Sequence, residues 1–424
     1  VSATDAIMLG WIDQTSLSAV SLAGQVQFVL SLFISGIAAG AGIMAAQYWG
    51  KQDAASIEKV IPIALRTNLL FSGLFTILAG FCPEMLMRIF TNDAALVASG
   101  SQYLRAVALS YVLCGISQVY LILLKNTGHA AVSSRISSTA VVLNIILNAI
   151  LIYGLCGAPA LGIRGAAYAT VAARVVELIW AYLETKKPER VRILWNRLFS
   201  SAGKILSEDF WRYTLPVLAA SLVWGIAYVL YSVIMGHMGS DAVAANSITS
   251  IAKSLLSCLI RGVSGGAGVL IGNLLGANEL EKAREYGGRL SHLSIAIGIV
   301  TGGLLMLISP AIVHFAPLSD TAAEYLQYML LFCGLNLMAQ SVNTTVLDGI
   351  FCAGGDAKFD MQGNIGAMWC FSVPLGFLAA FWLKLPVMVV YCIVNLDEIV
   401  KLPAVYHHYK KYIWVRNITR DIED

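Results

Sequence analysis

Long stretches without charge constrain this chain more than any other feature. The segments Gln14 to Gly50, Ile136 to Ile163 and Met361 to Leu383 contain no Asp, Glu, Lys or Arg. About 20 apolar residues of α-helix cross the hydrocarbon core of a bilayer, so each segment is long enough to span one. Charged residues make up 12% and hydrophobic residues 58% of the chain, whereas a soluble domain has roughly 25% charged residues. The composition excludes an ordinary soluble protein and indicates an integral membrane protein.

The apolar blocks between polar breaks predict an all-α fold with about twelve transmembrane helices. The block at 1–11 has half the length that a span requires, so we expect a first helix that is incomplete on its N-terminal side. The other predicted helices are 16–48, 60–82, 96–124, 133–155, 163–184, 209–237, 242–275, 286–315, 322–351, 360–383 and 386–408.

Basic residues follow the second, fourth, sixth and twelfth predicted helices, while the alternate connections are poor in them. They are Lys51, Lys59, Lys125, Arg135, the basic run within 185–207 and the tail from Lys410 onward. Because Lys and Arg mark the cytosolic side of a membrane protein, we expect these connections and both termini to lie in the cytosol.

A repeat divides the chain into two halves. The stretch "GAGIMAAQYWGKQD" from Gly40 resembles "GAGVLIGNLLGANE" from Gly266, at a shift of 226 residues. The same shift pairs Gly10 with Gly236, and Gly50 with Gly276, without a gap. We interpret the small residues as sites of close helix packing, and the last glycine of each copy as the end of its helix.

Six helices in each copy predict two parallel lobes, related by an axis along the membrane normal. The predicted boundaries are 1–184 for the first lobe, 185–207 for a cytosolic linker, 208–410 for the second lobe and 411–424 for a cytosolic tail. Two lobes of this kind offer a cleft between them, where rocking exposes a site alternately to each side of the membrane.

One carboxylate stands out in the first lobe. Asp5 lies inside the first apolar block, and an ionisable side chain within the membrane is a functional candidate by default. Asn144 and Asn148 lie four apart and so share a helix face, and Thr170 lies near the start of the next helix. The alternative is a structural Asp held by hydroxyl groups, with Asn and Thr tying helices together.

The second lobe lacks an equivalent acid, since the repeat shift carries Asp5 to Tyr231. Its candidate substrate-contacting residues are Trp224, Tyr228, Tyr231, Lys253, Arg261, Asn343 and Asp348. The aromatic residues can stack on a ligand or pack in the core, and Lys253 near the midplane must pair, snorkel or face water. The pairs Glu398 with Lys401 and Arg174 with Glu177 are spaced as surface ion pairs.

Other classes of function receive little support. A net charge of +3 with scattered basic residues does not indicate a nucleic-acid surface. The eight cysteines form no C-x-x-C pair or metal-ligand spacing, and we interpret them as small buried side chains. The chain has no plausible catalytic triad, metal cluster or phosphate loop, so an enzyme and a bound cofactor are not expected.

Several short stretches resemble the multidrug and toxic compound extrusion (MATE) transporters over essentially the whole chain, most closely those of prokaryotes. They are "TDAIMLG", "AAQYWGKQD", "LNIILNAILIYG", "LGIRGAAYAT", "CAGGDAKF" and "YIWVRNIT". The resemblance implies a twelve-helix antiporter with two six-helix lobes, which expels organic compounds, often cationic drugs, in exchange for H⁺ or Na⁺.

The resemblance also places the family's coupling residues on this chain. Its helix 1 acid falls on Asp5, its helix 5 polar pair on Asn144 and Asn148, and its helix 6 threonine on Thr170. Many relatives have an acid where this chain has Asn148, which favours protons over Na⁺ here. Acids that some relatives carry in helices 7 and 10 are absent.

The sequence therefore predicts a monomeric multidrug exporter in a prokaryotic inner membrane, with a drug-like organic substrate and a coupling cation as its partners. Lys253 and Arg261 depart from the pattern of cation exporters, because a cationic wall repels cationic ligands, and an anionic or zwitterionic substrate is compatible with them. The alternative is a lipid or glycolipid flippase of the same superfamily, in which these two residues bind a phosphate headgroup.

Overall fold

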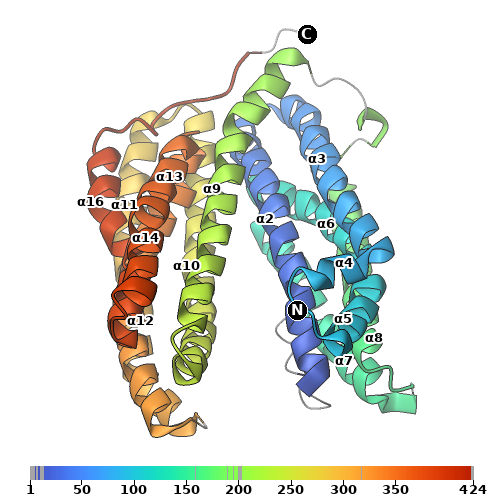
Figure 1. Ribbon diagram of the computed structural model, residues 1–424. Coiled ribbons are helices and arrows are strands. Elements are labelled where there is room, and N and C mark those ends of the chain that lie inside the picture. The colour runs from blue at the N-terminus through green and yellow to red at the C-terminus, as the bar shows by residue number, and fades with distance from the viewer. Residues whose placement is uncertain are drawn as a thin grey trace. The chain divides into compact units, whose positions relative to one another are not determined.

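The computed structural model describes residues 5, 8–9, 14–157, 159–188, 190–193, 195–198, 203–316 and 318–421. Within these ranges the chain is helical, with connecting turns and no strand, which confirms the predicted all-α fold. Most of the predicted first helix lies outside the described residues. Element labels follow Figure 1 and begin at α2.

The chain folds as two compact units. Unit 1 comprises Val1–Ala45 and Asp53–Thr214, and unit 2 comprises Ala46–Gln52 and Leu215–Asp424. The end of the helix α2 thus belongs to unit 2. The sequence-based boundaries at 184, 207 and 410 stay predictions.

Unit 1 is built on antiparallel neighbours such as α7 and α8, which lie side by side (Figure 1). Its apolar core joins side chains of α2 to those of α3, α5 and α6, including Val26, Leu30, Ala79 and Tyr103. The elements that begin in this unit are α2 (Gln14–Gly50), α3 (Ala54–Phe81), α4 (Pro83–Arg88), α5 (Ala94–Val107), α6 (Leu109–Leu124), η1 (Lys125–His129), α7 (Ala130–Tyr153), η2 (Leu155–Gly157), α8 (Ile163–Thr185), η3 (Trp195–Arg197) and α9 (Lys204–Gly236).

Unit 2 contains the rest of α9 and the remaining helices, among which α12 packs against α10, α11 and α16. Its elements are α10 (Ser240–Gly276), α11 (Leu280–Phe315), α12 (Asp320–Thr344), η4 (Thr345–Phe351), α13 (Ala357–Asn364), η5 (Ile365–Ser372), α14 (Val373–Phe377), η6 (Leu378–Trp382), α15 (Val387–Val394) and α16 (Asp397–Tyr409). Separate apolar clusters lie between α9 and α15, and between α10 and α12.

In the described part of the chain, nine helices are long and apolar enough to cross a membrane. Leu70, Leu255 and Leu307 are among many large apolar side chains that remain exposed on them, as a lipid-facing surface requires. Three cysteines, Cys82, Cys258 and Cys370, are also exposed, so the prediction that the cysteines are buried is wrong for these.

Two of the predicted helices are interrupted where a side chain of another helix donates a hydrogen bond to a backbone carbonyl oxygen. The predicted helix 96–124 is divided at Ala108, whose carbonyl oxygen accepts a hydrogen bond from Thr76 Oγ1 at 3.1 Å. The predicted helix 386–408 is divided after Val394, and there Asn336 Nδ2 donates to the carbonyl oxygen of Asn395 at 2.6 Å. A side chain that satisfies a carbonyl allows the helix to break inside an apolar environment.

The connection between the predicted helices 96–124 and 133–155 is shorter than expected, because α7 already begins at Ala130. Five residues, Lys125–His129, connect α6 to α7, and the backbone leaves the helical conformation at Thr127 and Gly128. Gly128 has a φ of 81°, which a residue with a side chain rarely adopts.

The repeated stretch forms a close contact inside unit 2. A Cβ atom on Gly276 would overlap the carbonyl oxygen of Gln47, and a Cβ on Gly50 would overlap the carbonyl oxygen of Asn273. Gln47 and Asn273 are themselves 226 residues apart, so the two contacts are equivalent in the repeat. The end of α2 and the end of α10 therefore pack backbone to backbone, as the small residues predict.

The helix ends in both copies depend on a residue other than the glycine. The helices α2 and α10 do end at Gly50 and Gly276. The left-handed residues, however, are Gln52 with φ of 64° and Asn278 with φ of 60°, again 226 apart. The two glycines are thus required for close approach and not for a left-handed turn.

We predict that Gly276→Ala destabilises the protein by about 1–3 kcal/mol, because the added methyl group has no space beside Gln47. The matched control is Gly266→Ala on the same helix, where no atom lies within 4 Å of the new Cβ. The control should be neutral or stabilising by up to about 1 kcal/mol. Thermal unfolding of the two purified full-length variants checks this, and equal shifts for both would contradict it.

Candidate functional site

The four residues predicted to bind the coupling cation meet in unit 1. Asn148 Nδ2 on α7 donates to Asp5 Oδ1 at 2.6 Å, and Thr170 Oγ1 on α8 donates to Asp5 Oδ2 at 3.1 Å. Asn144, one helical turn before Asn148, donates from Nδ2 to Thr170 Oγ1 at 3.2 Å. The side chain of Asp5 is fully buried. The helices α7 and α8 pack along each other, which brings these side chains together.

Sequence reasoning missed a third donor to the carboxylate. Tyr103 on α5 is buried, and its hydroxyl donates to Asp5 Oδ2 at 3.3 Å. A second tyrosine, Tyr153 at the end of α7, donates to the carbonyl oxygen of Met8 at 2.6 Å. No spacing or charge pattern separates either residue from the other tyrosines of the chain, so the sequence offers no signal for them.

The surroundings of Asp5 suit a carboxyl group that binds and releases a proton or another cation. A buried carboxylate is costly unless hydrogen bonds compensate for lost water, and Asn148, Thr170 and Tyr103 each donate one. In the described part of the chain, Asn148 Oδ1 has no hydrogen-bond partner. This buried oxygen can accept a hydrogen bond from a protonated Asp5 or contact a bound cation.

A small cavity lies next to this network. It has a volume of about 100 Å³ and is lined by Gln118, Ser137, Ala140, Val141, Thr170, Ala173, Arg174 and Glu177. That is space for a few water molecules, since each occupies roughly 30 Å³ in the liquid.

Arg174 and Glu177 form an ion pair at this cavity. The side chain of Glu177 is only 2% exposed, and its Oε2 also accepts from Ser117 Oγ at 3.5 Å. The prediction of a surface ion pair is therefore wrong. The i, i+3 spacing on α8 does place the two side chains together, but α6 packs against that face of α8 and covers it.

The residues predicted to contact substrate in unit 2 fall into separate groups. Trp224 and Tyr228 stack on α9, with ring centroids 5.6 Å apart. The exposed guanidinium of Arg261 lies 5.6 Å from the Trp224 ring centroid. These three residues therefore form one cationic and aromatic cluster.

The other predicted contacts lie elsewhere in unit 2. Lys253 Nζ donates to Asn336 Oδ1 on α12 at 2.8 Å. Asn343 is buried and donates from Nδ2 to Glu398 Oε2 at 2.8 Å, whereas Asp348 is exposed on η4. Tyr231 is buried in the cluster between α9 and α15. That all seven line one cleft stays a prediction.

A buried ionic network at the start of α16 was also missed. Lys401 is 5% exposed and lies 3.2 Å from Glu398 Oε1 and 3.6 Å from Asp397 Oδ2. The sequence predicted that Glu398 and Lys401 form a surface pair, and this prediction is wrong. Its i, i+3 spacing does not reveal that α12 and η5 cover this face of the helix.

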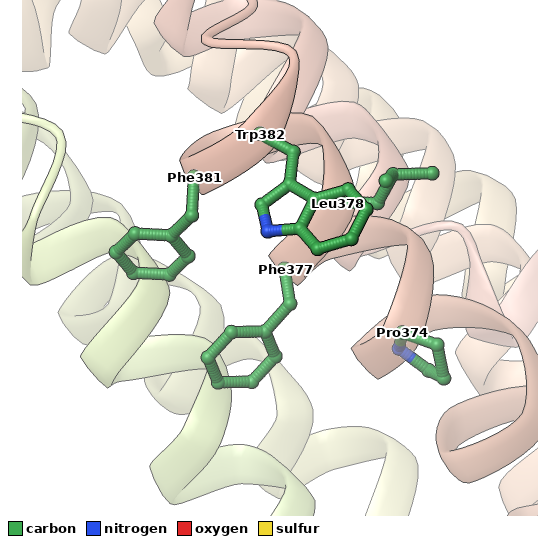
Figure 2. A pocket seen from close by; sticks show the side chains of 5 residues that line it. All are labelled: Pro374, Phe377, Leu378, Phe381 and Trp382. Carbon is green, nitrogen blue, oxygen red and sulfur yellow. The ribbon is translucent and has the colours of Figure 1, made fainter.

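A hollow of about 440 Å³ lies along α14 and η6, lined by Pro374, Phe377, Leu378, Phe381 and Trp382. Figure 2 shows the rings of Phe377, Phe381 and Trp382 around its open space. The Phe377 and Phe381 rings stack with centroids 5.5 Å apart. The lining suits apolar groups, including lipid chains, and holds no ionisable side chain.

The model of one protein family, MatE, matches residues 1–150 and 216–378 of this chain. Among curated proteins, the chain is 22% identical to a probable multidrug resistance protein, YoeA of Bacillus subtilis, over 97% of this chain and 89% of that protein. The match thus extends over both units.

Two solved structures share the fold, each with 19% identity over 97% of this chain and 91% of the solved chain. One, with a TM-score of 0.87, is a MOP superfamily transporter from Pyrococcus furiosus described as having a binding pocket of reverse polarity. The other, with a TM-score of 0.86, is a multidrug resistance MATE family transporter in an outward-facing conformation.

We predict that Asn148→Ala lowers the stability of the protein by about 1–3 kcal/mol, because it removes the donor that faces Asp5 Oδ1. The matched control is Thr139→Ala, an exposed position on the same helix, which should change stability by less than about 0.5 kcal/mol. Thermal unfolding of the full-length protein measures both. Loss of the same size in the two variants would show that Asn148 does not hold the carboxylate.

Proposed function

Because the chain belongs to the MatE family, we propose that it is a secondary active multidrug exporter, which moves organic small molecules out of the cell in exchange for H⁺ or Na⁺. Its described helices and its family make it a multi-pass membrane protein. The relatives that match it are named as transporters, which favours transport over catalysis. The proposal extends to alternating access, a prokaryotic inner membrane, cytosolic termini and a monomer.

The Asp5 network is the observation that carries this proposal. A carboxylate that is fully buried, with donors from three helices, provides a site where one positive charge can be bound and released. Binding of a charge changes which of these hydrogen bonds can form, because a protonated carboxyl group must donate where the carboxylate accepted. Such a change biases the packing of α5, α7 and α8 and thereby couples the cation to the conformation of unit 1.

A proton fits this site better than Na⁺. When Asp5 is protonated, the hydroxyl groups of Thr170 and Tyr103 can turn from donors into acceptors, and Asn148 Oδ1 is a further acceptor. One elementary charge that crosses a membrane potential of about 100 mV releases about 2.3 kcal/mol, which corresponds to a roughly fiftyfold gradient of a neutral solute. One proton per cycle therefore provides a useful driving force.

We predict that Asp5→Asn reduces ethidium efflux driven by a pH gradient more than about tenfold, which is a loss of about 1.4 kcal/mol or more of coupling. The assay uses the full-length protein in vesicles, with pH and Na⁺ gradients imposed separately. The matched control is Asp320→Asn, the same change at an exposed helix start. Unchanged proton-driven efflux in Asp5→Asn would exclude Asp5 as the coupling site, and efflux driven by Na⁺ alone would replace the proton with Na⁺.

A second candidate function is export of a lipid or glycolipid that carries a phosphate headgroup. The observation in its favour is the pair of cations on α10, where Arg261 is exposed beside Trp224 and Lys253 is half-buried beside Asn336. A cationic wall favours an anionic ligand and disfavours a cationic drug.

We predict that the double variant Lys253→Gln with Arg261→Gln separates the two functions. If the substrate is a phosphate-bearing lipid, transfer of a fluorescent phosphatidylglycerol across the vesicle membrane should fall more than about tenfold while ethidium efflux persists. If the substrate is a cationic drug, ethidium efflux should be unchanged or improved, and no lipid transfer should depend on the two residues.

A further inference from the structure

The helix α16 begins with a buried cluster of ionisable side chains. Asp397 and Lys401 are each 5% exposed, and Glu398 lies between them in sequence. Lys401 Nζ contacts both acids and also donates to Asn364 Oδ1 on α13 at 2.9 Å. Asp360, also buried, accepts a hydrogen bond from Asn364 Nδ2 at 3.1 Å. Two carboxyl groups thus contact one ammonium group, and the third is linked to it through Asn364.

The neighbouring basic side chains do not neutralise this excess of carboxyl groups. Lys253 on α10 is within electrostatic range of Asp397 and Glu398 but is hydrogen-bonded to Asn336. Arg261 on α10 faces another acid, the exposed Asp348. Four carboxyl groups then stand against three cations, and Lys401 contacts only Asp397 and Glu398 among them. A buried charge without a partner is strongly unfavourable, so the cluster must take up positive charge.

The added charge is best carried by a proton. The ammonium of Lys401 already lies between Asp397, Glu398 and Asn364, where a metal cation would have to bind. The ammonium donates hydrogen bonds to Glu398 and Asn364 and forms an ion pair with Asp397. The position of a monovalent ion is therefore filled by a side chain, and what remains is protonation of a carboxyl group.

A buried atom without a hydrogen-bond partner beside the cluster also supports protonation of a carboxyl group. Asn343 Nδ2 donates to Glu398, but in the described part of the chain its Oδ1 has no partner, although the residue is 1% exposed. The hydroxyl groups of Ser372 and Tyr231 are also buried and interact with each other beside the cluster. Tyr231 is within electrostatic range of Asp397 and Glu398. These are groups with which a protonated carboxyl group can exchange hydrogen bonds.

The cluster also occupies the elements that correspond, in the repeat, to those of the Asp5 site. The shift of 226 carries Asp5 to Tyr231, Asn144 to Cys370 and Thr170 to Leu396. Ser372 lies two residues after Cys370, and Asp397 follows Leu396. The ionic network is thus built on the counterparts of the helices that hold Asp5, although none of its acids is a repeat of Asp5.

We propose that unit 2 contains its own proton-binding site, with Asp360 as the proton acceptor and Lys401, Asp397, Glu398 and Asn364 as its ionic frame. Asp360 has the least compensation of the three acids, since among the described residues it accepts from Asn364 and forms no ion pair. Its use in transport rests on the proposed function, whereas its binding of a proton does not.

The site is connected to a residue predicted to contact substrate. Lys253 Nζ donates to Asn336, and Asn336 donates to the carbonyl oxygen of Asn395 at the break before α16. A change at Lys253 therefore reaches the helix that carries Asp397 through two hydrogen bonds. This chain of hydrogen bonds joins Lys253 to the helix that carries Asp397 and Lys401.

The test is pH-difference infrared spectroscopy of the full-length protein, which detects the carboxyl stretch of a protonated Asp. Asp360→Asn keeps an acceptor for Asn364 and should remove one carboxyl band that Asp5→Asn leaves in place. Asp320→Asn, an exposed acid, should leave both bands. A spectrum of Asp360→Asn identical to that of the wild type would overturn the proposal.

Lys401→Met provides a second measurement on the frame. Without the ammonium group, one more carboxyl group should be protonated at neutral pH, and the carboxyl band should grow. A band that does not grow would show that Lys401 does not balance these acids. Ethidium efflux measured on the same samples keeps the two proposals apart, because a band lost in Asp360→Asn supports proton binding even if no variant transports ethidium.

Discussion

The structure depends on the cost of leaving a polar group unpaired among apolar helices. The Asp5 carboxylate is fully buried, and its donors come from α5, α7 and α8. In lipid no water replaces a missing partner, so these hydrogen bonds fix how the three helices can be rotated about their axes. The same rule explains the interruptions at Ala108 and Asn395, where Thr76 and Asn336 satisfy the released carbonyl groups. Many packings of these helices would bury similar amounts of apolar surface. The polar contacts select one of them.

The two units meet this requirement with different chemistry. Unit 1 surrounds one carboxylate with neutral donors, which leaves its charge free to change when a proton binds. Unit 2 places a lysine among three acids, so most of its charge is fixed and only the excess acid can respond. We therefore propose that the lone carboxylate acts as a switch with two states, and that the ionic network stabilises one arrangement and adds a single titrating group to it. The difference follows from the replacement of Asp5 by Tyr231 in the second copy, since a phenol cannot supply the charge.

The sequence predicts the features that depend on short spacings and on composition. The apolar blocks give the helices, and the i, i+4 spacing of Asn144 and Asn148 places both on the face that meets Asp5. Partners from distant helices carry no such signal, which is why Tyr103 was missed. Spacing also cannot tell a solvated helix face from a covered one, and for this reason Lys401, whose partner Asn364 lies 37 residues away, was interpreted as a surface residue. Local pattern predicts which face a side chain is on, and only tertiary packing decides what covers it.

The duplicated glycines show what the two copies were constrained to keep. Gly50 and Gly276 allow backbone contact with Asn273 and Gln47, and the contact is equivalent in both directions, so loss of either glycine disturbs the same surface. No such reciprocity links the polar positions: Gln27 corresponds to Lys253, and Ser35 to Arg261. Since a symmetric packing contact penalises change in either copy, while a cation site needs to exist only once, divergence is expected at the polar positions. The residues that differ between the copies are accordingly the ones in which substrate preference and coupling should be sought.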